Sequence, residues 1–399
     1  MENNKAVLAF SGGLDTSFCV RYLKNERNLE VHTAFVDTGG FDKEETENIR
    51  NKALALGAAS HKNIDRVREF YEKGIRYMIF GNSLRQGTYP LSVSSERIFQ
   101  ALAVVEYAKE IEANYIAHGS TGAGNDQVRF DSVFQVMAPE IKIITPVREL
   151  RLSRREEIDY LAKHGCDYDY EKAKYSINQG LWGTSVGGAE TLTSDGELPE
   201  EAYPVKTVKT ETERISIDFE RGEPVALDGK RMSPEKLIRA LDQTAAPFGI
   251  GRDINVGDTI IGIKGRIGFQ AAAALIIINA HKLLEKHVLT KWQQYWKDQL
   301  GNWYGMMMHE AGYLDPVMRD VEAYLESSQQ YVTGTVYVKL DPYRHTLTGC
   351  RTEHDLMSSV FGEYGEINKA FTGDDVIGFT RIMSNQMKIF RAVNSKKNK

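Results

Sequence analysis

An apolar run at residues 5–10 leads directly into the sequence SGGLDTS at residues 11–17, and this junction constrains the fold more than any other feature. The run predicts a buried strand, and the pattern after it predicts a helix that begins near Asp15. Gly12 and Gly13 let main-chain N–H groups close around an anion without a Cβ in the way. The helix N-terminus adds unpaired donors and the positive end of its dipole. The segment therefore predicts a loop that holds the phosphates of a nucleotide.

The spacing of this loop separates it from other phosphate-binding motifs. It lacks the lysine of G-x-x-x-x-G-K-[ST], and it is not G-x-G-x-x-G. It resembles the S-G-G-x-D-[ST] loop of the ATP pyrophosphatases (PP-loop superfamily), which cleave ATP to AMP and pyrophosphate. The alternative interpretation is an ordinary glycine-rich turn, which the preceding strand and the D-T-S run disfavour.

The first 167 residues alternate short apolar runs with helical patterns, which indicates an α/β fold with a parallel sheet. Ligands bind beyond the carboxyl ends of such strands, so residues 11–17 and 119–126 are expected at one sheet edge. The predicted strands are 5–10, 30–36, 115–118 and 141–144, and the predicted helices are 16–26, 43–56, 66–78, 94–111 and 153–163.

The pattern breaks down between residues 168 and 205, where glycine, serine, threonine and two prolines predict long loops into a second domain. Beyond it, strands are predicted at 214–219, 259–263 and 330–339, and helices at 234–243 and 271–299.

Composition excludes several classes of function. A formal net charge of −5 gives no overall reason to expect nucleic-acid binding. The three cysteines form no CxxC pair, which argues against a disulfide framework and a zinc site. The longest apolar run, 271–278, is too short to span a bilayer, and residues 1–5 lack a signal-peptide pattern. We expect a cytoplasmic enzyme with small-molecule substrates and no membrane or nucleic-acid partner.

A second constellation, HGSTGAGNDQVRF, occupies residues 118–130. Asn125 and Asp126 are suited to hold an amine, and Arg129 to grip a carboxylate with two hydrogen bonds. A surface loop is the alternative. Together the two segments resemble the argininosuccinate synthase family, whose hallmarks are S-G-G-L-D-T-S and T-G-K-G-N-D-Q-V-R-F. The resemblance extends over residues 5–350, with further matches at 87–89, 181–182, 249–252, 261–264 and 280–281.

The resemblance implies a C–N ligase of arginine biosynthesis. In that family ATP, citrulline and aspartate give argininosuccinate, AMP and pyrophosphate through a citrullyl-adenylate, with Mg²⁺ on the phosphates. It also implies an adenine nucleotide alpha hydrolase-like domain at 1–167, an α+β synthetase and multimerisation domain at 168–360, an oligomerisation tail at 361–399, and a homotetramer.

By the same resemblance, residues of this chain take three roles. The expected catalytic residues are Asp15, Asp126 and Arg129. The expected ATP-binding residues are Ala9, Phe10, Ser11, Gly12, Gly13, Leu14, Asp15, Thr16, Ser17, Val36 and Gly119. The expected substrate-binding residues are Tyr89, Ser94, Arg97, Thr121, Asn125, Asp126, Arg129, Ser176, Ser185, Gly257 and Phe269. No side chain is assigned as a metal ligand.

Three positions depart from the family pattern. Gly257 stands where the family has a glutamate that meets the citrulline α-amino group, and Phe269 replaces a tyrosine near the same group. A buried ammonium needs an acceptor, so both changes favour a substrate whose α-nitrogen is acylated, such as N-acetyl- or N-succinylcitrulline. The alternative is that Asp258 takes over from the glutamate. Ala123 replaces a lysine, for which the sequence offers no account.

A succinyl group would need a cation, and the sequence does not rank Arg97, Arg252, Lys264 and Arg266 for that role. Two other functions stay open: another amide- or amidine-forming ligase with the same loop, and a non-catalytic nucleotide-binding derivative. The retention of Asp15, Asn125, Asp126 and Arg129 argues against the second.

Overall fold

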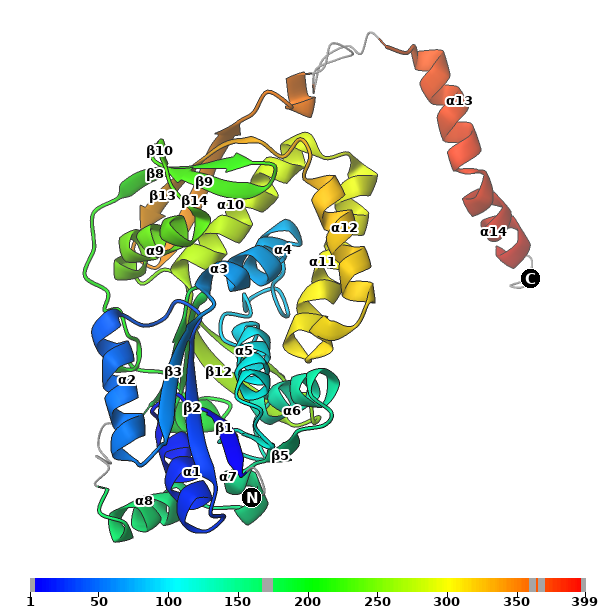
Figure 1. Ribbon diagram of the computed structural model, residues 1–399. Coiled ribbons are helices and arrows are strands. Elements are labelled where there is room, and N and C mark those ends of the chain that lie inside the picture. Colours follow the sequence, from blue (N-terminus) through cyan, green and yellow to red (C-terminus); the bar gives the residue numbers. More distant parts are fainter. Residues whose placement is uncertain (1–3, 167–174, 359–363, 365–369, 396–399) are drawn as a thin grey trace.

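A computed structural model describes residues 4–166, 175–358, 364 and 370–395 (Figure 1). Its first sheet is parallel, in the order β3-β2-β1-β4-β5, as the alternating pattern predicts. The strands are β1 Lys5–Ala9, β2 Glu30–Asp37, β3 Ser60–Asp65, β4 Tyr115–Ala117 and β5 Lys142–Ile144. The chain reverses its direction of winding between β1 and β4, and a ligand site is expected at such a point.

The edge strand β3 was not predicted because its sequence, SHKNID, is polar and only half-buried. It lacks the apolar run by which the other strands are recognised. Its place is set by parallel pairing with β2.

Helices cover both faces of this sheet: α1 Leu14–Asn25, α2 Lys43–Ala55, α5 Glu96–Glu110, α6 Asp126–Met137, α7 Pro146–Leu150 and α8 Arg154–Lys163 (Figure 1). Helices α2 and α8 begin with reciprocal capping boxes, Asp42 with Glu45 and Ser153 with Glu156. The helix predicted at 66–78 is interrupted. It runs as α3 Val67–Phe70, a π-helical turn at Tyr71–Ile75 and α4 Arg76–Phe80.

Two antiparallel sheets follow. One has the order β10-β9-β8-β13-β14, with β8 Glu213–Glu220, β9 Glu223–Leu227, β10 Lys230–Arg231, β13 Gly334–Asp341 and β14 Arg344–Arg351. The other has the order β11-β12-β7-β6, with β6 Ser176–Gly180, β7 Gly183–Gly187, β11 Arg252–Asp258 and β12 Lys264–Gln270. Helices α9 Pro234–Ala245 and α10 Ala272–Val288 pack against the sheet that contains β8 and β13.

Two predictions in this half are wrong. Residues 259–263 form the turn between β11 and β12, where the N–H of Thr259 donates to the Ile263 carbonyl oxygen at 2.7 Å. The helix predicted at 271–299 is two helices, α10 and α11 Lys291–His309, because the backbone is extended at Leu289 and Thr290 caps α11. Helix α12 Val317–Ser328 packs against α11.

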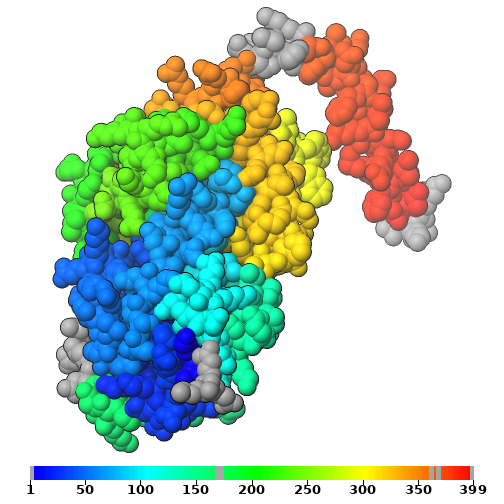
Figure 2. Space-filling view, viewed as in Figure 1, coloured from blue at the N-terminus to red at the C-terminus, as the bar shows by residue number. Residues whose placement is uncertain are grey.

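One hydrophobic core joins the two halves: buried Val7 of β1 and buried Leu340 of β13 belong to the same cluster. Helices α13 Gly373–Met383 and α14 Asn385–Ser395 lie apart from this body, as Figures 1 and 2 show, and none of their residues is buried. The predicted domain boundaries at 167 and 361 lie outside the described residues. Among those described, no helix has the length and apolarity to cross a bilayer.

Candidate active site

The loop between β1 and α1 has the geometry of an anion cradle. Gly12 has φ +77°, and Gly13 is the extended residue that precedes α1. The hydroxyls of Thr16 and Ser17 donate to the Gly13 carbonyl oxygen, at 3.3 and 2.7 Å. No described side chain caps the start of α1, and its first N–H groups have no carbonyl partner in the preceding turn, so they are left for a ligand.

The loop after β4 packs directly against this cradle. A Cβ on Gly119 would lie 3.1 Å from the Asp15 carbonyl carbon and 3.2 Å from the Thr16 nitrogen. A Cβ at this position would be tighter than most real contacts, so the neighbouring backbone would have to give by a few tenths of an ångström, and glycine permits the observed approach without that shift.

Asp126, at the start of α6, sits between two arginines. Arg97 Nε donates to its Oδ2 at 3.0 Å, and Arg129 Nη1 donates to its Oδ1 at 2.7 Å. Burial alone would raise the pKa of Asp126, but the two guanidiniums outweigh it and hold the pKa at about 2. Asp126 is therefore a fixed anion, suited to receive an ammonium group.

His309, the last residue of α11, lies behind this cluster. Arg129 Nε donates to its carbonyl oxygen at 3.0 Å. Burial, together with the positive charges of Arg129 and Arg85, lowers the pKa of His309 to about 2. Its imidazole is thus neutral at physiological pH.

Three further acidic groups have a raised pKa and are protonated more easily than usual. Burial raises the pKa of Glu96 to about 7, against the opposing effects of Arg97 and the Thr38 hydroxyl. Burial also raises the pKa of Asp15 and that of Glu157, a buried residue of α8 whose carboxyl group interacts with Asp15. A proton shared by this pair reduces the negative charge that a triphosphate would meet at the loop.

These elements surround one cavity of about 1000 Å³. All of the site residues predicted from the sequence line it except Gly12, Ser17 and Phe269. The Gly12 carbonyl faces Lys52, and the buried Ser17 hydroxyl bonds the turn of its own helix. Phe269 is fully buried against Tyr89, with ring centroids 5.2 Å apart, so its ring lies behind the cavity wall and not in it.

The cavity wall also contains residues that the motifs did not indicate: Lys52, Arg85, Glu96, Gln100, Arg154 and His309. Lys52 Nζ donates to the Gly12 carbonyl oxygen at 2.5 Å, and Arg154 acts electrostatically on Asp15. Both therefore bring positive charge to the nucleotide loop, where Ala123 brings none. They come from helices α2 and α8 and carry no local sequence signal.

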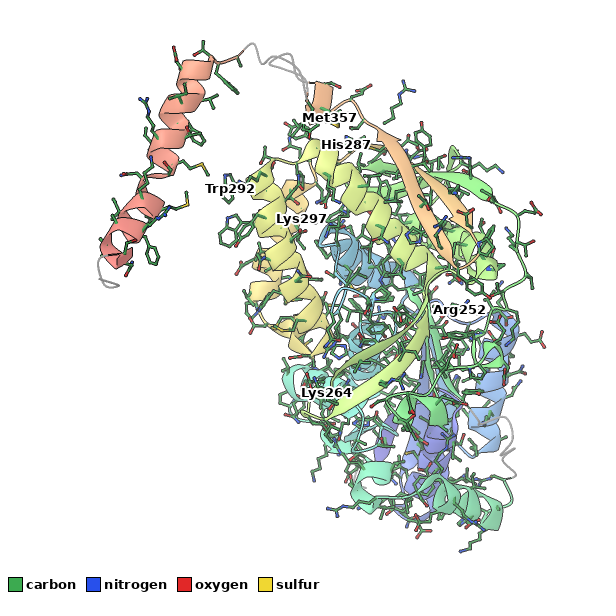
Figure 3. All side chains as sticks on the ribbon, turned by 180° about the vertical axis from the view of Figure 1, so that it is seen from behind. Arg252, Lys264, His287, Trp292, Lys297 and Met357 are labelled. Atoms are coloured by element: carbon green, nitrogen blue, oxygen red, sulfur yellow. The ribbon has the colours of Figure 1, made fainter. Side chains whose placement is uncertain are left out.

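The β11–β12 ribbon forms another wall, where Gly257 and Gly265 are directly opposite each other. Asp258 also lines the cavity, and its two carboxylate oxygens pair with Lys264 Nζ at 2.7 and 2.8 Å. Lys264 lies at the turn end of the ribbon and Arg252 at the other end, where it pairs with Glu200 (Figure 3).

Comparisons with known proteins agree with this architecture. A family model described as the arginosuccinate synthase N-terminal HUP domain matches residues 5–167, and one described as the arginosuccinate synthase C-terminal domain matches residues 175–390. An argininosuccinate synthase of Methanocaldococcus jannaschii is 40% identical, over 84% of this chain and 85% of the relative. One of Xanthomonas campestris is 36% identical over 99% and 100%. One of Sulfurisphaera tokodaii is 34% identical over 91% and 93%.

Proposed function

This chain belongs to the argininosuccinate synthase family, and on that premise we propose that it joins an N-acylated citrulline to aspartate, with ATP as the activating substrate. The family activity is that of a C–N ligase which produces AMP and pyrophosphate. The acylated substrate is the part of the proposal that goes beyond the family activity.

The reaction has two steps. The ureido oxygen is a poor leaving group, so it first attacks the α-phosphorus of ATP and pyrophosphate leaves. The amine of aspartate then attacks the ureido carbon, AMP leaves with the oxygen, and the amine loses a proton. Most of the catalytic work is therefore to place three substrates and to stabilise charge on phosphate.

Different parts of the cavity wall suit different substrates. The loop at 11–17, with Lys52 and Arg154, suits the phosphates. Thr121, Asn125 and the fixed anion Asp126 suit aspartate. The citrulline backbone and ureido group are assigned to the remaining predicted residues of the wall: Tyr89, Ser94, Arg129, Ser176 and Ser185.

One observation carries the proposal of an acylated substrate: the ribbon offers no carboxylate where a free α-ammonium would need one. Gly257 has no side chain, and the Asp258 carboxylate is paired with Lys264. The polar groups nearest to Gly257 are the Gln86 amide and the Arg85 guanidinium. A cation beside the head group disfavours an ammonium and tolerates a neutral amide.

Mg²⁺ is expected to arrive on the ATP phosphates. No group of three or more histidine, cysteine or acidic side chains gathers in the described part of the chain, and Mg²⁺ commonly uses phosphate oxygens, waters and one or two carboxylates. Asp15 is the carboxyl group on the cavity wall at the phosphate loop that fits this role. When bound, the ion would neutralise phosphate charge and ease the departure of pyrophosphate.

We also propose that the chain forms a homotetramer through its C-terminal helices. Helices α13 and α14 carry a set of exposed apolar side chains: Val376, Ile377, Phe379, Ile382, Met383, Met387, Ile389, Phe390 and Val393. Such a surface on a detached arm is typical of a segment that packs on another copy. Light scattering is expected to give four times the 45.0 kDa of the chain, and a variant ending at residue 370 is expected to give a smaller species.

The function is tested by pyrophosphate release from ATP and aspartate, with citrulline, N-acetylcitrulline or N-succinylcitrulline as the third substrate. We expect turnover with an acylated form and at least ~100-fold lower kcat/KM with free citrulline, as an unpaired buried charge costs several kcal/mol. Efficient turnover of free citrulline would contradict the acylated substrate and leave the family activity intact. No turnover with any substrate would favour a non-catalytic nucleotide-binding protein.

A further inference from the structure

The space that faces the substrate head group is shaped by two opposed glycines. Gly257 of β11 and Gly265 of β12 are partners across the ribbon, and both line the cavity. A Cβ on Gly265 would meet one atom within 4 Å, the Thr259 methyl carbon at 3.9 Å. The cavity is therefore open beside this pair.

A tight turn brings two side chains to the same place. Backbone bonds connect Arg85 with Tyr89, and Gln86 and Gly87 have φ values of +53° and +77°. This turn sets Gln86 Nε2 and Arg85 Nε at 3.2 and 3.5 Å from the position of a Cβ on Gly257, with Gln86 Oε1 at 3.0 Å. Two hydrogen-bond donors and one neutral acceptor, but no carboxylate, thus stand where a free amino acid would need an anionic acceptor.

Arg85 is held in place at the cavity wall. Its Nη2 donates to the Asp258 carbonyl oxygen at 2.7 Å, and its side chain is 13% exposed. It also forms a long ion pair with Glu310, whose carboxylate oxygen lies 3.9 Å from Nη1. A carbonyl and a distant carboxylate compensate the guanidinium charge only weakly, so the site retains an affinity for an anion.

The four cations that the sequence left unranked are bonded to other groups. Arg97 is bonded to Asp126 and Glu96, Lys264 to Asp258, and Arg252 to Glu200. Arg266 donates three hydrogen bonds to backbone carbonyl oxygens, those of Glu190, Thr193 and Gly196, whereas Arg85 donates one. Arg85, which the sequence did not single out, lies beside Gly257 with more of its donors available, and is therefore the cation best placed to meet an anionic substituent there.

We propose that Arg85, assisted by the Gln86 amide, binds the terminal carboxylate of a dicarboxylic acyl group on the α-nitrogen of the citrulline substrate. This inference rests on the proposed function and sharpens it: the preferred substrate is of the N-succinyl type, and the N-acetyl form is a poor one. The guanidinium can donate two hydrogen bonds to such a carboxylate, whereas an acetyl methyl group offers it no partner.

The test compares kcat/KM for N-succinyl- and N-acetylcitrulline in the full-length enzyme and in Arg85→Gln. Loss of a charge-assisted contact predicts a fall of about 100-fold for the succinyl substrate, mainly through KM, and a change below about 3-fold for the acetyl substrate. Arg231→Gln is the matched control, because it removes an exposed arginine charge on β10, outside the residues that line the cavity. We expect it to alter neither value.

Two further measurements keep the test informative if Arg85→Gln fails to fold. One uses the Arg85→Lys variant, and the other is calorimetric binding of both substrates to the unaltered enzyme. The lysine variant should recover part of the succinyl affinity, and the unaltered enzyme should bind the succinyl form about 100-fold more tightly than the acetyl form. Equal use of both acyl forms, or equal losses for both in Arg85→Gln, would overturn the role of Arg85 while the proposed function stands. Turnover of free citrulline alone would overturn both.

Discussion

The two ends of the cavity are built differently. At the nucleotide and aspartate end, the loops at 11–17 and 119–126 touch through backbone, and Asp126 has both oxygens bound by arginines. At the head-group end, opposed glycines leave space and Arg85 is only weakly paired. The first end is closely packed and charge-compensated, which suits adenylate chemistry. The second is open, and this is the space that the proposed acylated substrate would fill.

At the nucleotide and aspartate end, we expect the largest effect from removal of the Asp126 carboxylate. Asp126→Ala leaves Arg97 and Arg129 buried without their carboxylate, so we expect a loss of about 3–5 kcal/mol in the free energy of unfolding. Asp126→Asn should retain more stability but lower kcat/KM for aspartate by about 1000-fold. Urea denaturation and pyrophosphate release measure these effects. Asp131→Asn, which breaks pairs with His118 and Arg148, is the control and should leave the KM for aspartate unchanged.

The pH dependence of stability tests the charge balance of the same end. The pKa of Glu96 is about 7 in the folded protein and near 4.5 in an unfolded chain. Between these values the unfolded chain releases its proton first, so this group makes the protein less stable as pH rises from 4.5 to 7. Glu96→Gln has no such proton to release, so its free energy of unfolding does not fall over this pH range. At pH 7.5 we expect this free energy to exceed that of the unaltered protein by up to about 3 kcal/mol. Urea denaturation at pH 5 and 7.5 measures the free energy of unfolding of both proteins. An equal difference between them at the two pH values would contradict the prediction.

A methyl group tests the backbone contact between the two loops. Gly119→Ala places a Cβ within 3.1–3.2 Å of Asp15 and Thr16, so the loop must shift and the KM for ATP should rise about 30-fold. Gly122→Ala is a matched control in the same segment, because its Cβ meets Arg148 Cγ at 3.7 Å, an ordinary contact. Similar KM values in the two variants would show that the close approach does not matter for ATP binding.

The head-group end is tested most directly by returning a carboxylate to it. Gly257→Glu should lower kcat/KM for the acylated substrate and raise it for free citrulline, shifting their ratio by about 10-fold or more. The effect is the smallest of the four because the Gln86 side chain, 3.0 Å from the new Cβ, must also move. Gly257→Gln has the same size without the charge. If it shifts the ratio equally, space rather than charge decides the preference.

The sequence by itself determined the nucleotide loop, the parallel sheet and the family, because each depends on consecutive residues. SGGLDTS after an apolar run describes its own strand, turn and helix, and the NDQVR segment sets Asp126 and Arg129 one helical turn apart. The polar edge strand β3 could not be predicted because its residues form no apolar pattern.

Only the tertiary structure decided what surrounds the head group. Gly257 lies about 170 positions after Arg85 and Gln86, and their proximity depends on a turn and a ribbon that meet across the cavity. Packing also decided the position of the Phe269 ring, which points into the core against Tyr89 and not into the cavity. Patterns along a chain report on local periodicity and on motifs, whereas the partner of a charged side chain is set by long-range packing. For this reason Arg85, which carries no motif, became visible only in the folded protein.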